Sequence, residues 1–437
     1  MAVVVYHADR APHLRTSSRE LLIVPLLCGL IMMLLTFSLV ERESGNDVDW
    51  IAKCKVAGRA VCGLLFLGLL TWQRCRPSLH FATARSCWLI LFIGWAVVST
   101  MWSPLRTISL GQSGSLAILL LMSLAIAMLW KDERDTSFIL SFVSLSLLFI
   151  CAMLLVLRIA VPASGSLQRV GEGLLHATNG AATASLGILI LLVARLKWRW
   201  LWARLLFVPG LCVYAAVLVF AANRTSLALT FLLSAGLVFV ATNRKIWSSG
   251  LMLLCGVFVL YLTVDPGLRL VGSGGEGVEE FLMRGQSLDQ LRELSGRNEL
   301  WTTVWSSFLE SPWIGHGYFM TSSTGEIEVW YREGNFPAHN IWLQALATTG
   351  VIGALLFVIG LLTTYGKTNW TLWRASATRP MALLMTTVGC WYLGWSLTSD
   401  SILGPVQPET VVFFTLLGIG LGSEFQLRRL AGAKGRS

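Results

Sequence analysis

Residues 138–157 read FILSFVSLSLLFICAMLLVL, twenty consecutive residues without a charged side chain. An α-helix needs about 20 apolar residues to cross the roughly 30 Å hydrocarbon core of a bilayer. Blocks of the same character recur along the chain, and open sheet edges cannot satisfy their backbone groups in lipid. We therefore predict an all-α fold, that of a polytopic membrane protein.

The composition agrees with this class of protein. Hydrophobic residues make up 55% of the chain and charged residues only 13%, against about 25% charged in soluble domains. The formal net charge of +10 could indicate a nucleic-acid partner. The basic residues, however, lie in short connections between apolar blocks, so we expect none. The nine cysteines are scattered, mostly within apolar blocks, and indicate neither a disulfide framework nor a zinc site.

The apolar blocks predict about 12 transmembrane helices. The predicted spans are 21–40, 56–73, 87–102, 114–130, 138–160, 177–194, 205–222, 225–242, 247–264, 340–364, 381–398 and 410–423. The third and the last are the shortest. They divide the chain into an N-terminal bundle of about nine helices (1–264), a long loop containing amphipathic helices (265–339), and C-terminal helices with a tail (340–437).

Lysine and arginine in the connections predict the orientation, because short cytoplasmic loops carry an excess of both. Placing Arg10, Arg15 and Arg19 inside puts most basic residues of the short connections inside as well. Both termini are then cytoplasmic, and the loop from Asp265 to Ala338 faces outward. If one helix too many or too few were counted, the basic connections would no longer fall on the same side of the membrane. The alternation therefore supports both the number of helices and the orientation.

The long loop contains signals for two short helices. Ser287 and Gln290 have the spacing of a capping box, which predicts a helix to Leu294. A second helix should begin near Arg297 and end before Pro312. Its apolar residues recur at helical spacing and form one stripe; they are Leu300, Trp301, Val304, Trp305, Phe308 and Leu309. We expect this Trp-rich helix to lie along the membrane interface or to cap the bundle.

Three arginines on the predicted outer side are candidates for binding an anion. Arg224 lies in the tight turn Asn223-Arg224-Thr225, and Arg169 lies in an outer loop. Arg297 heads the amphipathic helix, where the helix dipole disfavours a cation unless an anion is held there. The alternative for Arg224 is an interfacial arginine that reaches the lipid headgroups, and Arg169 alone is a weak signal.

His339 is the candidate for proton transfer. It lies in Pro337-Ala338-His339-Asn340 at the start of a predicted membrane helix. The helix dipole there disfavours a protonated imidazole, so the ring can accept a proton. The alternative is an interfacial histidine beside a helix cap. His316, in Gly315-His316-Gly317, is expected to be a turn residue.

These motifs together resemble the O-antigen ligase and O-antigen polymerase superfamily. They comprise Ser295-Gly296-Arg297 with Trp301, then Ser311-Pro312-Trp313-Ile314-Gly315-His316-Gly317, then His339-Asn340-Ile341-Trp342-Leu343, and finally Gly350-Val351-Ile352-Gly353. Arg224 falls where the family has an arginine-containing turn, although Asn223 replaces the usual serine. The match of Arg169 to an earlier outer-loop arginine is looser.

The resemblance implies a membrane glycosyltransferase, with a fold of the GT-C type, in the bacterial inner membrane. Such enzymes move a glycan from a polyprenyl (undecaprenyl) pyrophosphate carrier to an acceptor hydroxyl on the outer face, with inversion and without a cofactor or metal. The acceptor is lipid A–core, another glycan or a protein. The resemblance makes His339 the general base and Arg224, Arg297 and Arg169 the residues that bind pyrophosphate.

Two other functions compete with this interpretation. Asp47-Val48-Asp49 in the first outer loop could hold a divalent cation beside a diphosphate, as in metal-dependent glycosyltransferases. A transporter or flippase for a lipid-linked glycan would use broken or charged helices at mid-membrane depth. The candidate residues instead gather at the predicted outer surface, which favours chemistry there. The sequence does not distinguish a ligase from a polymerase or a protein glycosylase.

Overall fold

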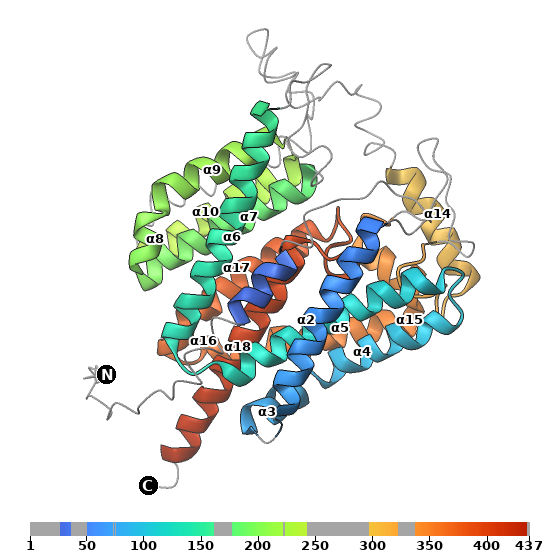
Figure 1. Cartoon of the computed structure of the whole chain (residues 1–437), viewed down its shortest axis with the longest axis horizontal. Helices are drawn as coiled ribbons and strands as arrows, with labels where there is room; N and C mark the ends of the chain where they lie inside the picture. The colour runs from blue at the N-terminus through green and yellow to red at the C-terminus, as the bar shows by residue number, and fades with distance from the viewer. Residues whose placement is uncertain are drawn as a thin grey trace.

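The computed structural model describes residues 27–35, 50–72, 74, 76–160, 177–221, 223–242, 297–321 and 337–434. These residues form helices and no strands, as predicted (Figure 1). A short helix covers residues 27–35. The labelled helices are α2 (Trp50–Trp72), α3 (Pro77–Arg85), α4 (Cys87–Val98), α5 (Arg106–Leu129), α6 (Glu133–Ala160), α7 (Ala177–Val193), α8 (Leu201–Leu205), α9 (Phe207–Phe220), α10 (Arg224–Thr242), α14 (Arg297–Glu310), α15 (Ile341–Leu361), α16 (Lys367–Trp373), α17 (Arg379–Trp395) and α18 (Pro408–Lys434).

Six helical segments of the described chain are long and apolar enough to cross a membrane. They are Lys53–Trp72, Arg106–Leu129, Glu133–Ile159, Thr178–Trp198, Ile341–Trp373 and Pro408–Ala433. α3 and α4 would add a seventh if counted as one span, although they are bent by 66°. The predicted number of twelve is not confirmed: α9 and α10 are apolar but shorter, and the predicted span 247–264 lies outside the described residues.

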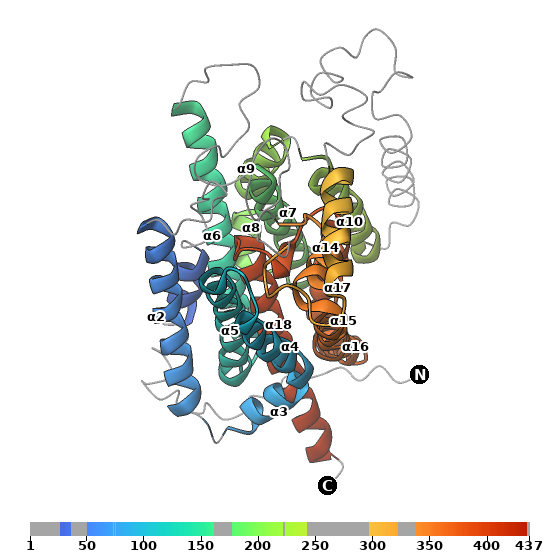
Figure 2. The ribbon, with the colours of Figure 1, turned by 90° about the vertical axis from the view of Figure 1, so that its right-hand side faces the viewer.

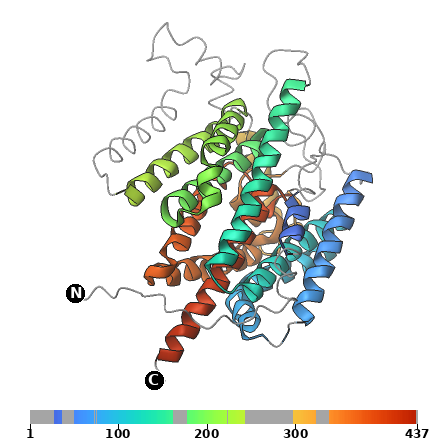
Figure 3. The same ribbon diagram turned by 60° about the vertical axis from the view of Figure 1, so that its left-hand side comes forward.

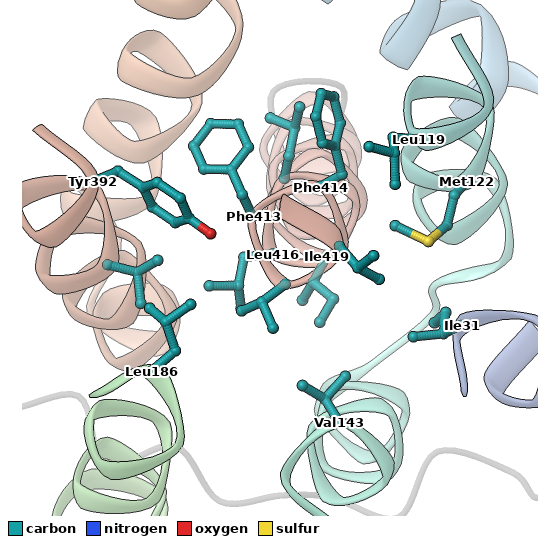
Figure 4. Close-up of a cluster of buried hydrophobic side chains, with 14 of the residues drawn as sticks. Ile31, Leu119, Met122, Val143, Leu186, Tyr392, Phe413, Phe414, Leu416 and Ile419 are labelled. Carbon is teal, nitrogen blue, oxygen red and sulfur yellow. The ribbon is translucent and has the colours of Figure 1, made fainter. Parts of the chain in front are cut away.

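α18 is the central helix of the bundle. Figure 4 shows Phe413, Phe414, Leu416 and Ile419 of α18 surrounded by side chains of other helices. Those helices include α5, which contributes Leu119 and Met122, α6, α7 and α17. Residues of the predicted N-terminal and C-terminal helices therefore share one apolar core. The sequence predicted only a short span at 410–423, whereas the helix continues to Lys434.

The outer faces of α2 and α6 are apolar and uncovered. Leu64 and Leu67 of α2 and Phe149 and Val156 of α6 are exposed. In Figures 2 and 3, α2 stands at the edge of the bundle. Apolar side chains on the outside of a helical bundle face lipid. These helices therefore contact the membrane along their length.

A buried carboxylate explains why α18 continues past its apolar segment. Glu424 is fully buried, and Arg85 of α3 forms an ion pair with it. Arg428 donates to Oε1 of Glu424 through Nε at 3.0 Å, and Thr368 of α16 donates to Oε2 at 2.8 Å. A buried charge is tolerated when it is paired and hydrogen-bonded in this way. The cluster joins α3, α16 and α18 at one end of the bundle, hereafter the Glu424 end.

Candidate active site at the His339 end

His339 lies at the opposite end of the bundle from Glu424. The backbone N–H of Ile341, at the start of α15, donates to the carbonyl of Ser396 just beyond α17, with an N···O distance of 3.0 Å. At the same end, Leu229 near the start of α10 packs against Gly394 near the end of α17. The start of α10 therefore lies beside the end of α17. The start of α10, the start of α15 and the connection between α17 and α18 therefore meet at this end, hereafter the His339 end.

Hydrogen bonds from two helices fix the backbone on either side of His339. The indole Nε1 of Trp301 in α14 donates to the Ala338 carbonyl at 3.0 Å, and the Ala338 N–H donates to Oε1 of Gln344 at 2.8 Å. On the other side, the Asn340 side chain accepts from the N–H groups of Trp342 and Leu343, which makes it the N-cap of α15. His339 itself is partly exposed and has a left-handed backbone, with φ of 48°. It is thus presented from a rigid turn at the start of a helix.

The sequence does not identify Trp301 and Gln344 as site residues. Trp301 belongs to the motif, but its hydrogen-bond partner is the backbone carbonyl of Ala338, 37 residues further along the chain. Gln344 is fully buried and lies one turn into α15. A buried amide at the start of a membrane helix is the signal that would have identified it, because such a polar group needs a partner. Both are positioning residues for His339.

α15 is broken at Gly350, and the turn Pro312–Gly317 closes the break. The N–H groups of His316 and Gly317 donate to the carbonyls of Ala347 and Thr348 at 3.0 and 2.9 Å. In return, the N–H of Val351 donates to the Pro312 carbonyl at 2.8 Å. The turn thereby takes over hydrogen bonds that an uninterrupted helix would make with itself.

Two glycines of the motif are required by this backbone-to-backbone contact. Gly315 and Gly350 have φ of 67° and 65°. A Cβ atom at Gly350 would lie 2.2 Å from the carbonyl oxygen of Trp313, and one at Gly315 would lie 2.5 Å from the carbonyl carbon of Thr348. Neither position has room for a side chain. Gly315 and Gly350 are therefore structural, and they fix the motif turn to α15.

α14 confirms the amphipathic helix predicted in the long loop. It runs from Arg297 to Glu310, and Leu300, Val304 and Phe308 are buried against residues that include Ala338 and Ala347. Trp305 and Leu309, predicted in the same stripe, are instead 46% and 59% exposed. The helix therefore caps α15 with one edge of its apolar stripe. The helix predicted to end at Leu294 lies outside the described residues.

Arg224 is the first residue of α10, and Asn223 is its cap. Oδ1 of Asn223 accepts from the N–H of Ser226 at 2.9 Å, as a serine at this position could also do. The guanidinium Nε and Nη2 atoms of Arg224 are buried. A charged side chain that is partly buried at the start of an apolar helix is a candidate site residue.

The other predicted residues are described in part or not at all. Arg297 begins α14 one turn before Trp301, so its backbone lies near the His339 end; its side chain is outside the described residues. Arg169, Asp47 and Asp49 also lie outside them. Within the described part of the chain, no cluster of His, Cys, Asp and Glu could hold a metal ion.

His316 and Tyr318 have structural surroundings. His316 lies in the turn that follows α14, as predicted, and its Nε2 lies 2.6 Å from the Ser307 carbonyl of α14. The hydroxyl of Tyr318 donates to the Leu403 carbonyl at 3.5 Å. Burial, and secondarily the nearby Asp400 carboxylate, raise the pKa of Tyr318 well above its ordinary value. Tyr318 therefore stays protonated, and it joins the motif turn to the α17–α18 connection.

An open cavity of about 640 Å³ lies at the Glu424 end. Residues Asp132–Arg134, Trp200 and Trp202 line it. The adjacent Trp130 packs against Gly422 near the end of α18, which places the cavity far from His339. It is therefore no part of the candidate site.

Comparison with known proteins defines the class of this helical membrane protein. Residues 210–358 match the family model of the O-antigen ligases, which is 149 of the 437 residues. This segment includes Arg224, Arg297, His339 and the paired glycines. The match confirms the resemblance to the O-antigen ligase and polymerase superfamily over this segment. The domain and the apolar helices indicate a bacterial membrane protein with glycosyltransferase-like activity. No curated protein matches the chain.

Proposed function

We propose that this protein transfers a glycan from a polyprenyl pyrophosphate carrier to an acceptor hydroxyl on the outer face of the bacterial inner membrane. The observation that carries the proposal is His339, partly exposed on a turn that Trp301, Gln344 and Ser396 hold in place within the O-antigen ligase domain. A base fixed beside a reaction site can take the acceptor proton during attack. Lipid A–core, another glycan or a protein would supply the hydroxyl.

The sugar is attached to the carrier through C1, and the reaction exchanges one bond at this atom for another. The acceptor oxygen attacks C1 from the face opposite the pyrophosphate, and His339 accepts the hydroxyl proton. The C1–O bond to the pyrophosphate breaks, and its electron pair leaves with the phosphate oxygen. Attack from the opposite face inverts the configuration. Arg224 and Arg297, supported by Arg169, would stabilise the growing negative charge with their planar forks.

The proposed site faces outward if both termini are cytoplasmic. A reporter enzyme active only in the cytoplasm, fused after Lys434, should be active, and the same reporter inserted after Gly275 should be silent. The reason is that Gly275 belongs to the loop that the sequence predicts on the outer side, while Lys434 ends α18 at the Glu424 end. An active reporter at Gly275 would reverse the orientation and move His339 to the cytoplasmic face.

Transfer should continue at an unchanged rate in excess EDTA. The leaving pyrophosphate would be stabilised by guanidinium groups, so no divalent cation is required. The measurement is glycan transfer by purified protein from a lipid-linked donor, with and without the chelator. Loss of activity that manganese restores, and that Asp49→Asn abolishes again, would assign the protein to the metal-dependent class instead.

A further inference from the structure

Arg59 is a buried cation that the proposed reaction does not use. It lies in α2 within the apolar span Lys53–Trp72, and it is 7% exposed. Nη1 donates to the Ser115 hydroxyl at 3.3 Å and Nη2 to the Val406 carbonyl at 3.5 Å, both long distances, and Nε has no partner. Among the described residues no carboxylate forms an ion pair with it.

An uncompensated arginine inside a membrane bundle is costly, so its presence there indicates that something supplies negative charge. Arg59 lies toward the His339 end of the bundle, because it contacts Val406 just before the start of α18. Residues 53–57 of α2 are exposed or partly exposed, and burial begins at Gly58 and Arg59. Arg59 is therefore the first charged residue of α2 that the structure describes as buried.

Polar groups with unused hydrogen-bonding capacity come from the two other segments that Arg59 contacts. Gln112 in α5 lies one turn from Ser115, and Gln407 follows Val406 directly. The side-chain Oε1 atoms of both glutamines are buried and have no hydrogen-bond partner. The Oε1 atoms of Gln112 and Gln407 are thus buried acceptors without donors, and Nε of Arg59 is a buried donor without an acceptor. Such groups are rare in proteins unless a ligand or water satisfies them.

The packing of α5 against α18 explains why these segments converge. The two helices run parallel, with the Ser123 hydroxyl donating to the Phe414 carbonyl at 2.6 Å and Gly418 against Ile126. The same register places Ser115 opposite Val406, where Arg59 contacts both. Figures 1 and 3 show α2 beside α5.

The α17–α18 connection joins these groups to the candidate active site. It receives hydrogen bonds from Ile341 at Ser396, next to His339, and from Tyr318 at Leu403. Three residues further, the Val406 carbonyl accepts from Arg59. The groups around Arg59 therefore lie on the far side of this connection from His339, within the same outer part of the bundle.

We propose that Arg59, Gln112, Ser115 and Gln407 bind the phosphate and adjacent hydroxyl groups of a lipid head. A guanidinium supplies the charge and donors for phosphate oxygens, and the amide oxygens accept from hydroxyls. This chemistry fits the sugar-diphosphate head of a polyprenyl carrier and also the head of phosphatidylglycerol. The first source rests on the proposed function, in which such a carrier is the donor; the second does not.

Thermal unfolding of the purified full-length protein, with and without added lipid, tests the site. Arg59→Met should raise the melting temperature without lipid, because it removes an uncompensated buried charge at similar volume. Polyprenyl-diphosphate-linked sugar or phosphatidylglycerol should stabilise the wild type and not Arg59→Met. Lys53→Met is the matched control, since Lys53 is exposed on the same helix, and it should respond as the wild type does. Native mass spectrometry should show a fall of at least about tenfold in bound lipid for Arg59→Met only.

The outcomes separate the proposal from its alternatives. A lower melting temperature for lipid-free Arg59→Met, or failure of this variant to fold, would make Arg59 a structural partner of Ser115 and Val406 and overturn the proposal. The proposal would also be overturned if the lipids stabilised Arg59→Met as much as the wild type. It would be overturned as well if neither lipid stabilised either protein. Arg59-dependent binding of phosphatidylglycerol in a protein without transferase activity would refute the proposed function alone. Normal transfer with Arg59-independent binding would refute only this site.

Discussion

Replacing His339 with asparagine is expected to slow glycan transfer by about 10²–10⁴-fold, the usual contribution of a general base. Asparagine tolerates the left-handed backbone that this position requires, so the turn should keep its shape. Donor binding should change little, because the base acts on the acceptor proton. The measurements are the single-turnover transfer rate and the affinity for the lipid-linked donor. A folded His339→Asn protein that transfers at the wild-type rate would exclude His339 as the base.

Two further measurements distinguish a base from a structural histidine. The wild-type rate should rise with pH through about 6 to 7, where an ordinary imidazole loses its proton, and the residual rate of His339→Asn should not. Trp301→Phe removes the hydrogen bond to Ala338, worth about 1 kcal/mol, and keeps an aromatic ring in the apolar cluster beneath α14. Its rate should fall several-fold while the pH profile is kept. The same pH profile in the wild type and His339→Asn would place the titrating group elsewhere.

Replacing Arg224 with lysine is expected to weaken donor binding by about 10- to 150-fold. A hydrogen bond to a charged group contributes about 1.5–3 kcal/mol, and an ammonium cannot reproduce the paired contacts of a guanidinium. Because part of the Arg224 guanidinium is buried at the start of α10, the shorter cation is also held away from the phosphate. Affinity for a polyprenyl-diphosphate-linked sugar is the quantity to measure.

The control for this substitution is Arg429→Lys. Arg429 is exposed near the end of α18 at the Glu424 end, and its replacement should leave donor affinity unchanged. Arg297→Lys should resemble Arg224→Lys, since both residues are proposed to hold the pyrophosphate. Wild-type affinity in a monodisperse Arg224→Lys protein would remove Arg224 from the site.

Local sequence patterns were sufficient for elements whose signals are close together in the chain. The start of α14 at Arg297 and its end before Pro312 follow from helix-breaking residues and apolar spacing. The start of α15 after His339 follows from the Asn340 cap. The candidate site could be predicted from the sequence only in part. The sequence located His339 and Arg224 at helix starts, but not the packing that brings those starts to one end of the bundle.

Features that depend on distant contacts could not be predicted. The sequence contains Gly350 but does not show that α15 breaks there, because the hydrogen bonds that close the break come from the Pro312–Gly317 turn. The length of α18 was underestimated because Glu424 suggests an exit from the membrane; its partner Arg85 is 339 residues away. Arg59 fell within a predicted span, near its outer end, and nothing in its neighbours distinguishes it.

The broken helix also limits how relatives of this protein can be recombined. The Pro312–Gly317 turn and the two halves of α15 share hydrogen bonds, and Trp95 of α4 adds one more by donating to the Thr349 carbonyl at 3.0 Å. Exchanging the predicted outer loop alone would separate these donors from their acceptors in α15. A chimera that alters acceptor choice should therefore exchange residues 297–353 as one block and retain the tryptophan at position 95. Grafting boundaries belong within the second half of α15, beyond the break.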